Sequence, residues 1–175
     1  MIVVLMGVTG SGKSTIGTLL AARTKAIFAD ADDYHPEANK SKMAAGEPLN
    51  DDDREPWLET LNGLIRGWVA AGRSGVLACS ALKERYRATL AAGMSPGAVS
   101  FVLLEGTREL IASRLAGRQH EFMNPRLLDS QFATLEPPRE ALWVVNDRSP
   151  EAVVSEILAG LGFNGRSDRS EKEGS

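Results

Sequence analysis

The feature that most constrains how this chain can fold is a glycine-rich stretch close to its start. Residues 7–15 match the pattern G-x-x-x-x-G-K-[ST]. Residues 2–6 before them form an apolar, β-branched run typical of a buried strand, and apolar side chains recur at helical spacing over residues 16–23. A strand, a glycine-rich turn and a helix in this order are the context that a phosphate-binding P-loop requires. Because both neighbours are in place, we interpret the stretch as a P-loop rather than as a chance glycine-rich turn.

This stretch predicts a binding site for a nucleoside triphosphate. Glycines let the backbone N–H groups point inward at a helix N-terminus, where they bind phosphate oxygens. We expect Lys13 to contact the β- and γ-phosphates and the Ser14 hydroxyl to ligate Mg²⁺. The residues expected at the triphosphate are Gly7, Val8, Thr9, Gly10, Ser11, Gly12, Lys13, Ser14 and Thr15.

Length and composition narrow the class of protein. The 175 residues are 43% apolar and 25% charged, which is ordinary for one domain whose core needs no disulfide. A net charge of -3 argues against a nucleic-acid partner. One cysteine excludes an internal disulfide, no apolar run approaches the roughly 20 residues that cross a bilayer, and residues 1–3 carry no leader signal. We therefore expect a soluble, cytoplasmic protein with no membrane partner.

Strand and helix patterns alternate along the chain. The short apolar runs typical of strands occupy residues 2–6, 26–29, 76–79, 99–104 and 142–145. Helical material separates these runs. We therefore predict an α/β, three-layer fold, in which a five-stranded parallel sheet is flanked by helices on both faces.

Helix boundaries can also be predicted. An apolar stripe over residues 57–69 predicts a helix with Pro56 near its start. Ser149-Pro150 predicts the start of the last helix, which should stop near Gly162. Residues 1–163 would then form a single domain. The polar residues 164–175 are expected to be a disordered C-terminal tail.

Acidic residues follow the second predicted strand. In an open parallel sheet, ligands gather at the carboxyl ends of the strands, where the P-loop also lies. If the strand continues far enough, side-chain alternation places Asp30 and Asp32 on the same side. One carboxylate could then hold water on Mg²⁺ while the other accepts a proton from a substrate hydroxyl, although such aspartates also cap helices and solvate turns. We favour function for Asp30 and Asp32 and either helix capping or turn solvation for Asp33, with His35 as a weaker candidate.

Residues 46–57 contain three consecutive aspartates followed by Arg54. Such a run is ordinarily a solvated loop or a helix N-terminus favoured by the helix dipole. The guanidinium of Arg54 could be neutralised by these aspartates, or it could bind a substrate carboxylate through two parallel hydrogen bonds. The spacing alone leaves both possibilities open.

Cations follow the third and fourth predicted strands. Lys83 and Arg87 are four residues apart and would share one face of a helix near the binding edge, where they could bind an anion or simply meet solvent. Arg114 and Arg118 precede the fifth strand, where an arginine of a mobile lid could close over the phosphates. A basic, solvent-facing helix end is the alternative for Arg114. Cys79 is predicted to be a small buried residue with no catalytic role.

Taken together, these stretches resemble the gluconokinase family, a branch of the small P-loop kinases that also includes shikimate kinases. The resemblance spans residues 2 to about 162. Beside the P-loop, it is carried by Gly-Glu-Pro-Leu-Asn-Asp-Asp-Asp-Arg at 46–54, a string that is highly specific to this family. The other segments that carry it are residues 30–36, 42–45, 56–58, 79–83, 86–87 and 127–136.

The resemblance implies transfer of the ATP γ-phosphate to the 6-hydroxyl of D-gluconate, with Mg²⁺, by a homodimer. It implies a substrate-binding insertion over about residues 33–72 and a mobile lid over about residues 114–126. Asp32 would act as base, Asp30 would support Mg²⁺ through water, and Arg118 would close from the lid onto the transferring phosphate, with Arg114 also at ATP. The residues implied at the sugar acid are Asp32, His35, Arg54, Lys83, Arg87 and His120.

The lid departs from the family pattern. Members often read Gly-His-Phe-Met, whereas residues 120–123 of this chain read His-Glu-Phe-Met, so that the histidine is displaced by one position. Two other functions stay open on the sequence: another small-metabolite kinase, such as a shikimate or nucleoside kinase, and a nucleotide-binding module that no longer catalyses. The presence of Lys13, Ser14, Asp30 and Asp32 argues against the module.

Overall fold

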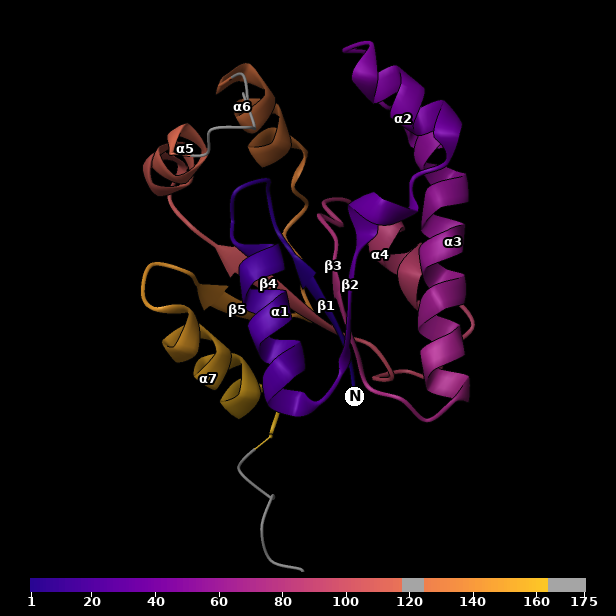
Figure 1. Ribbon diagram of the computed structural model, residues 1–175, viewed down its shortest axis with the longest axis vertical. Helices are drawn as coiled ribbons and strands as arrows, with labels where there is room; N and C mark the ends of the chain where they lie inside the picture. The colour runs from indigo at the N-terminus through magenta and orange to yellow at the C-terminus, as the bar shows by residue number, and fades with distance from the viewer. Residues whose placement is uncertain (118–124, 164–175) are drawn as a thin grey trace, which may run out of the picture.

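The computed structural model describes residues 1–117 and 125–163, and within them the chain forms a parallel sheet (Figure 1). Its strands are β1 (Ile2–Met6), β2 (Ile27–Asp30), β3 (Gly75–Ala78), β4 (Ser100–Glu105) and β5 (Leu142–Val145). Every pairing is parallel, and the strands lie in the order β2-β3-β1-β4-β5. The predicted five-stranded parallel sheet is confirmed, and each strand begins and ends within one residue of its predicted bounds.

Helices cover both faces of this sheet. The helices α1 (Lys13–Thr24) and α7 (Pro150–Gly160) pack on one face, and α3 (Asp51–Ala70) and α4 (Glu84–Ala91) pack on the other. Successive side chains of a strand point to opposite faces. Val3 and Leu5 of β1 therefore join the apolar cluster of α1 and α7, whereas Val4 and Met6 join that of α3 and α4. An uninterrupted apolar run is what a central strand buried on both faces needs.

The start of α3 differs from its prediction. The helix begins at Asp51, so Pro56 lies inside it rather than near its first residue. Asn50 and Asp53 form a capping box, in which each side chain accepts the backbone N–H of the other residue at 2.8 and 3.0 Å. This cap and the favourable interaction of early carboxylates with the helix dipole start the helix ahead of the proline, which removes only one N–H donor.

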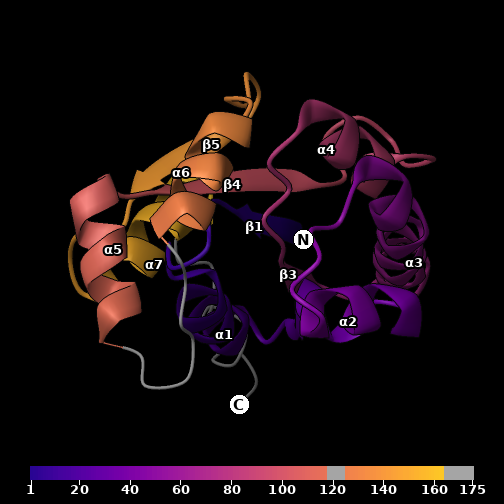
Figure 2. The same cartoon turned by 90° about the horizontal axis from the view of Figure 1, so that it is seen from above.

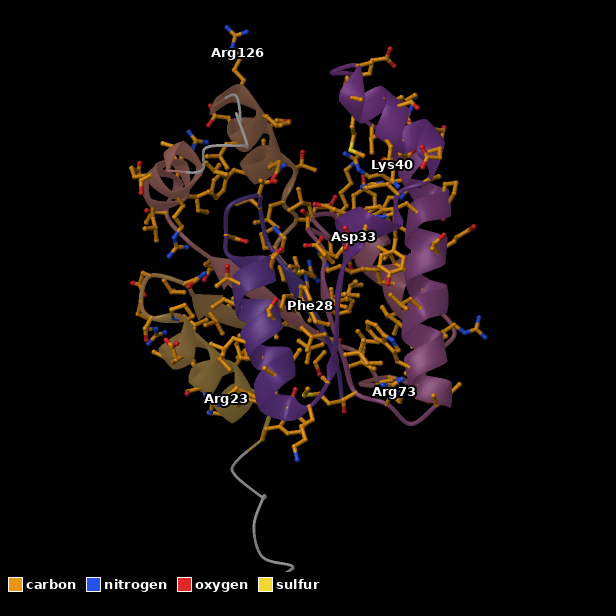
Figure 3. All side chains as sticks on the ribbon, viewed as in Figure 1. Arg23, Phe28, Asp33, Lys40, Arg73 and Arg126 are labelled. Atoms are coloured by element: carbon orange, nitrogen blue, oxygen red, sulfur yellow. The ribbon has the colours of Figure 1, made fainter. Side chains whose placement is uncertain are left out.

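Four further elements lie at the end of the molecule where the strands end (Figures 1 and 2). They are η1 (Ala31–Tyr34), α2 (Glu37–Ala44), α5 (Arg108–Ala116) and α6 (Pro125–Thr134). Figure 3 shows Asp33, Lys40 and Arg126 toward this end, with Arg23 and Arg73 toward the other. Within residues 1–117 and 125–163, no helix is both long enough and apolar enough to span a membrane. The predicted tail, residues 164–175, falls outside the described residues.

Candidate active site

The P-loop joins the carboxyl end of β1 to the first residue of α1. Gly12 has a φ of 95° and a Cβ there would lie 2.3 Å from Nδ2 of Asn146, so the position requires glycine. The same Nδ2 donates to the Ser11 carbonyl at 2.8 Å and holds the loop in place. Nζ of Lys13 donates to the carbonyls of residues 7–8 at 3.0 and 2.9 Å, so its ammonium lies over the loop.

A carboxylate at the end of β2 meets the P-loop side chain that is expected to bind Mg²⁺. Ser14 Oγ donates to Asp30 Oδ2 at 2.7 Å, and Asp30 Oδ1 accepts the N–H of Asp32 at 3.0 Å. A hydroxyl that donates its proton in this way keeps its lone pairs for another ligand. Because hydroxyl and carboxylate oxygens are donors that Mg²⁺ prefers, the pair fits a magnesium ion.

Asp32 reaches this site by a route that the sequence did not predict. β2 ends at Asp30 and η1 follows directly, so strand alternation does not place Asp32, and the Asp30 side chain caps η1 instead. The Asp32 side chain is 88% exposed, and its Oδ1 lies 4.0 Å from Nε2 of His35. Of the two roles predicted for Asp33, helix capping is wrong, because α2 follows Pro36 and has no side-chain cap. Asp33 instead lies exposed in η1, which leaves solvation of the turn.

His35 is held as a neutral ring beside Asp32. Its ring stacks on that of Trp57, with centroids 4.3 Å apart and an interplanar angle of 13°. Burial lowers the pKa of His35 below 6.5, and the charge of Arg54 lowers it further. Its Nδ1 lies 3.3 Å from Nδ2 of the buried Asn39. A neutral imidazole both donates and accepts hydrogen bonds, which suits contact with hydroxyl groups.

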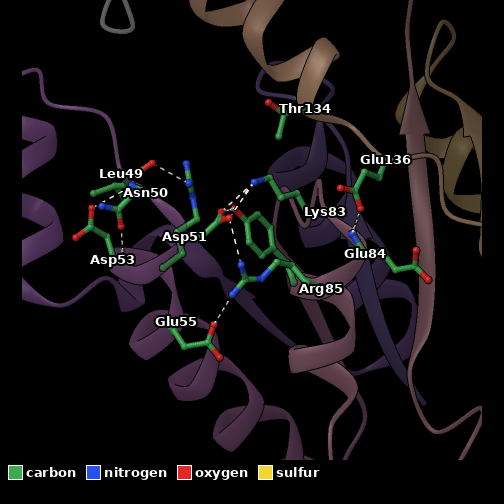
Figure 4. Close-up of polar contacts among 12 residues, drawn as sticks. Leu49, Asn50, Asp51, Asp53, Glu55, Lys83, Glu84, Arg85, Thr134 and Glu136 are labelled. Atoms are coloured by element: carbon green, nitrogen blue, oxygen red, sulfur yellow. Dashed lines mark hydrogen bonds and ion pairs between the residues drawn. The ribbon is translucent and has the colours of Figure 1, made fainter.

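Asp51, the first residue of α3, forms ion pairs with Lys83 and Arg85 at the start of α4 (Figure 4). The carboxylate of Asp51 accepts from Nζ of Lys83 at 3.0 and 3.1 Å, from a guanidinium nitrogen of Arg85 at 3.2 Å, and from the hydroxyl of Tyr86. The hydrogen bond from Tyr86, and next that from Lys83, hold the pKa of Asp51 below its ordinary value. The charge of Lys83 is therefore balanced by the protein itself.

Arg54 lies in a different electrostatic setting. Its guanidinium donates to the Leu49 carbonyl at 2.8 Å and lies 5.8 Å from the centre of the Tyr86 ring. The neighbouring aspartates bind other cations, since Asp51 binds Lys83 and Asp53 accepts from Nζ of Lys42 at 2.9 Å. Of the possibilities left open by the sequence, a direct ion pair between Arg54 and these aspartates is not observed among the described residues. The charge of Arg54 still contributes, after the hydrogen bonds of Asn50 and Lys42, to lowering the pKa of Asp53.

Arg87 is placed otherwise than its spacing predicted. Its side chain is buried, and burial lowers its pKa. The guanidinium donates to the carbonyls of residues 81–82 at 2.9 and 3.1 Å and to that of Glu136 at 3.0 Å. Lys83 precedes α4 and binds Asp51, so the two cations do not share a solvent-facing stripe. This geometry favours a structural role for Arg87 over substrate binding.

Arg114 of α5 is connected to the P-loop through Asn146. One guanidinium nitrogen donates to the Asn146 carbonyl, and the other terminal nitrogen is buried without a partner among the described residues. That nitrogen is a donor suited to a phosphate oxygen.

Burial raises the pKa of Cys79 to about 12, so its thiol stays protonated at neutral pH. The predicted site residues Arg118 and His120 lie outside the described residues.

Several residues of the site were missed by sequence reasoning. Asn146 follows the last strand, and the rule that polar residues at carboxyl ends of strands meet ligands could have drawn attention to it. Asp51 was one of three adjacent aspartates with nothing to distinguish it. Gln131, which accepts the N–H of Thr9 at 2.7 Å, lies in the segment 127–136 that carries the family resemblance, but nothing in that segment assigned it a role.

Comparisons with known proteins show what the chain is similar to. Residues 2–138 match a family model described as an AAA domain. The chain is 42% identical to the thermoresistant gluconokinase of Escherichia coli, over 90% of this chain and 91% of that protein. It is 41% identical to a gluconokinase of Arabidopsis thaliana, over 90% of each. The crystal structure of a gluconokinase from Sinorhizobium meliloti superposes with a TM-score of 0.81 at 39% identity, covering 92% of this chain and 91% of that one. A shikimate kinase from Aquifex aeolicus, at 20% identity and a TM-score of 0.61, shares the fold.

Proposed function

Because the chain belongs to the gluconokinase family, we propose that it transfers the γ-phosphate of ATP to the 6-hydroxyl of D-gluconate, giving 6-phosphogluconate and ADP. The observation that carries the proposal is the likeness to gluconokinases over most of both chains. The arrangement of the site supports it, because a P-loop, an exposed carboxylate and a cation are the groups that this transfer needs. The cation is Arg54, which forms no ion pair with a carboxylate in the part of the chain that the structure describes.

Residues 7–15 form the phosphate-donor half of the site. Their backbone N–H groups would bind the phosphates at the N-terminus of α1, with Lys13 at the β- and γ-phosphates and Arg114 alongside. Ser14 and Asp30 would hold Mg²⁺, the serine directly and the aspartate through water. When bound, Mg²⁺ neutralises charge on the phosphate oxygens.

Asp32 is the proposed general base. The carboxylate of Asp32 is exposed, and the backbone N–H of the same residue donates to Asp30 Oδ1. The proposed base, Asp32, and the proposed metal residue, Asp30, therefore lie in one hydrogen-bonded turn. The carboxylate would accept the proton of the 6-hydroxyl as that oxygen bonds to phosphorus. The neutral ring of His35 would contact gluconate hydroxyls beside it.

The proposed acceptor half of the site comprises residues 32–54 and 83–87. Within it, Arg54 is the proposed partner of the gluconate carboxylate, because its charge is not balanced by an ion pair within the described part of the chain. Lys83 is already bound by Asp51 and would contact hydroxyl groups. This division of roles narrows the family-based expectation that Arg54, Lys83 and Arg87 act together.

A coupled ADP-release assay with D-gluconate tests the function. We expect turnover that depends on gluconate, ATP and Mg²⁺, with 6-phosphogluconate as product. Shikimate and nucleosides serve as alternative acceptors, and turnover with one of these but not with gluconate would refute the proposal. If the protein binds ATP yet consumes none with any sugar acid, it is a nucleotide-binding module.

We also propose that the protein is a homodimer of the cytoplasm, with a lid over residues 114–126 that brings Arg118 and His120 to the substrates. These proposals rest on the family resemblance and, for the compartment, on the lone buried cysteine. Sedimentation equilibrium tests the dimer.

A further inference from the structure

Helix α6 is bonded to the P-loop through one side chain. Oε1 of Gln131 accepts the N–H of Thr9 at 2.7 Å, and Nε2 of Gln131 donates to Thr9 Oγ1 at 2.9 Å. The oxygen and the nitrogen of the Gln131 amide therefore both bond to Thr9, which lies 122 positions away in the sequence. Because the amide both donates and accepts here, it fixes the backbone and the side chain of Thr9 together.

Just past the end of α6, Glu136 is bonded to the loop before α4. Its N–H donates to the Leu82 carbonyl at 2.9 Å, and its carboxylate accepts the N–H of Glu84 at 2.7 Å (Figure 4). A carboxylate at the first N–H of a helix is favoured by the helix dipole. Its own carbonyl accepts from Arg87 at 3.0 Å. Lys83, a cation of the proposed acceptor half, lies in the sequence between Leu82 and Glu84, the two residues that Glu136 holds.

The two anchored loops also touch each other. The N–H of Gly7 donates to the Ser80 carbonyl at 3.2 Å. Val8 of the P-loop, Leu82 of the second loop and Leu128 of α6 belong to one buried apolar cluster. The second loop is not relaxed, because Ala81 has a φ of 44°, a left-handed conformation that non-glycine residues rarely adopt. Such a loop keeps its shape only where its surroundings hold it.

We propose that Gln131 and Glu136 are positioning residues that set the distance between the transferred phosphate and the acceptor hydroxyl. The inference rests on the proposed function, because it assigns one anchor to each substrate. A hydrogen bond from Leu135 N–H to the Gln131 carbonyl, at 3.0 Å, continues the helical pattern past Thr134, so a short stiff segment joins the anchors. Phosphoryl transfer depends mainly on positioning, and a displacement of about 1 Å costs on the order of 10²-fold in rate.

The test compares Gln131→Ala and Glu136→Ala with Ser130→Ala, a change at an exposed residue of the same helix. We expect Gln131→Ala to raise the KM for ATP, and Glu136→Ala to raise the KM for gluconate, each by about ten-fold, with the other KM unchanged. In both variants kcat should fall about ten-fold or more, and ATP hydrolysis should rise relative to transfer to gluconate. Ser130→Ala should match the wild type.

Equal rises of both KM values in both alanine variants, in step with a lower thermal midpoint, would show a merely structural role and overturn the inference. Glu136→Gln keeps an oxygen acceptor for Glu84 and should restore the KM for gluconate. If Gln131→Ala does not fold, Thr9→Val, which removes only Oγ1, tests the same contact. Absence of wild-type turnover with gluconate would instead refute the proposed function. The KM for ATP in acceptor-free hydrolysis then still distinguishes Gln131→Ala from Glu136→Ala.

Discussion

The donor half and the acceptor half of the candidate site are built in opposite ways. The donor half is nine consecutive residues, 7–15, fixed by backbone geometry and by contacts from Asn146 and Gln131. The acceptor half is assembled from segments that are far apart in the sequence. Asp51 alone accepts from residues 32, 34 and 35 positions further on.

This difference separates two kinds of residue. In the donor half, the ammonium of Lys13 donates to the backbone carbonyls of residues 7–8, which holds it over the loop that would bind the phosphates. In the acceptor half, several cations already serve the protein, since Asp51 binds Lys83 and carbonyls bind Arg87. The number of cations near a site therefore overstates the charge that it offers to a ligand, and substitutions should have sharply unequal effects.

Replacement of Lys13 should have the largest effect. We expect Lys13→Met to lower kcat/KM by about a thousand-fold or more, because in the proposed function the charge of Lys13 stabilises the transferring phosphate. The coupled ADP-release assay measures the loss, and an unchanged thermal midpoint shows that the fold persists. Arg23→Met removes an exposed cation at the far end of α1 and should leave turnover unchanged. Equal losses in both variants would mean that overall charge, not the P-loop contact, matters.

Asp32→Asn should have the next largest effect. Loss of the base is expected to lower kcat by about 10²- to 10³-fold while the dissociation constant of ATP changes little. Steady-state kinetics and a nucleotide-binding titration measure the two quantities. The neighbouring exposed residue offers a matched control, Asp33→Asn, which should behave as wild type. A parallel loss of kcat and ATP affinity would assign Asp32 to the metal or to the structure of the turn instead.

Arg54→Ala should sharpen the division of roles within the acceptor half. If Arg54 binds the gluconate carboxylate, its removal should raise the KM for gluconate by about 10- to 100-fold, with a smaller change in kcat. D-gluconamide, which lacks the carboxylate charge, should be used equally well by the wild type and by this variant. Lys83→Ala provides the comparison. If the KM for gluconate rises in Lys83→Ala but not in Arg54→Ala, Lys83 rather than Arg54 binds the gluconate carboxylate.

Local sequence patterns were enough to predict the sheet and the donor half. A central strand such as β1 is apolar throughout because both its faces are buried, and the P-loop is contiguous, so each shows its own pattern. Helix starts were harder. The apolar stripe of α3 begins at Trp57, yet the helix starts at Asp51, because a capping box adds a turn that carries no apolar signal.

The acceptor half could be predicted only as a set of candidates. Asp51, Asp52 and Asp53 are chemically identical in the sequence, and only the packing of α3 beside α4 decides that Asp51 faces Lys83. Arg87 shows the same limit, because an i, i+4 spacing from Lys83 gives no information on which cation is buried. The family resemblance named candidate segments without ordering the residues within them.

Acid titration of stability tests whether the ion-pair cluster of the acceptor half exists in solution. The hydrogen bonds from Tyr86 and Lys83 hold the pKa of Asp51 below 3.8, so this carboxylate contributes stability that is fully present above that pH and is lost as pH falls through its folded pKa. Asp51→Asn removes the titrating group. Its thermal midpoint should therefore fall less steeply than that of the wild type between about pH 4 and pH 2, by a difference on the order of a few degrees. Asp52→Asn, at an exposed residue of the same helix turn, should follow the wild-type curve. Coincident curves for Asp51→Asn and the wild type would mean that the cluster is not formed. Lys83 would then not be neutralised by Asp51, and there would be no reason to assign the gluconate carboxylate to Arg54 rather than to Lys83.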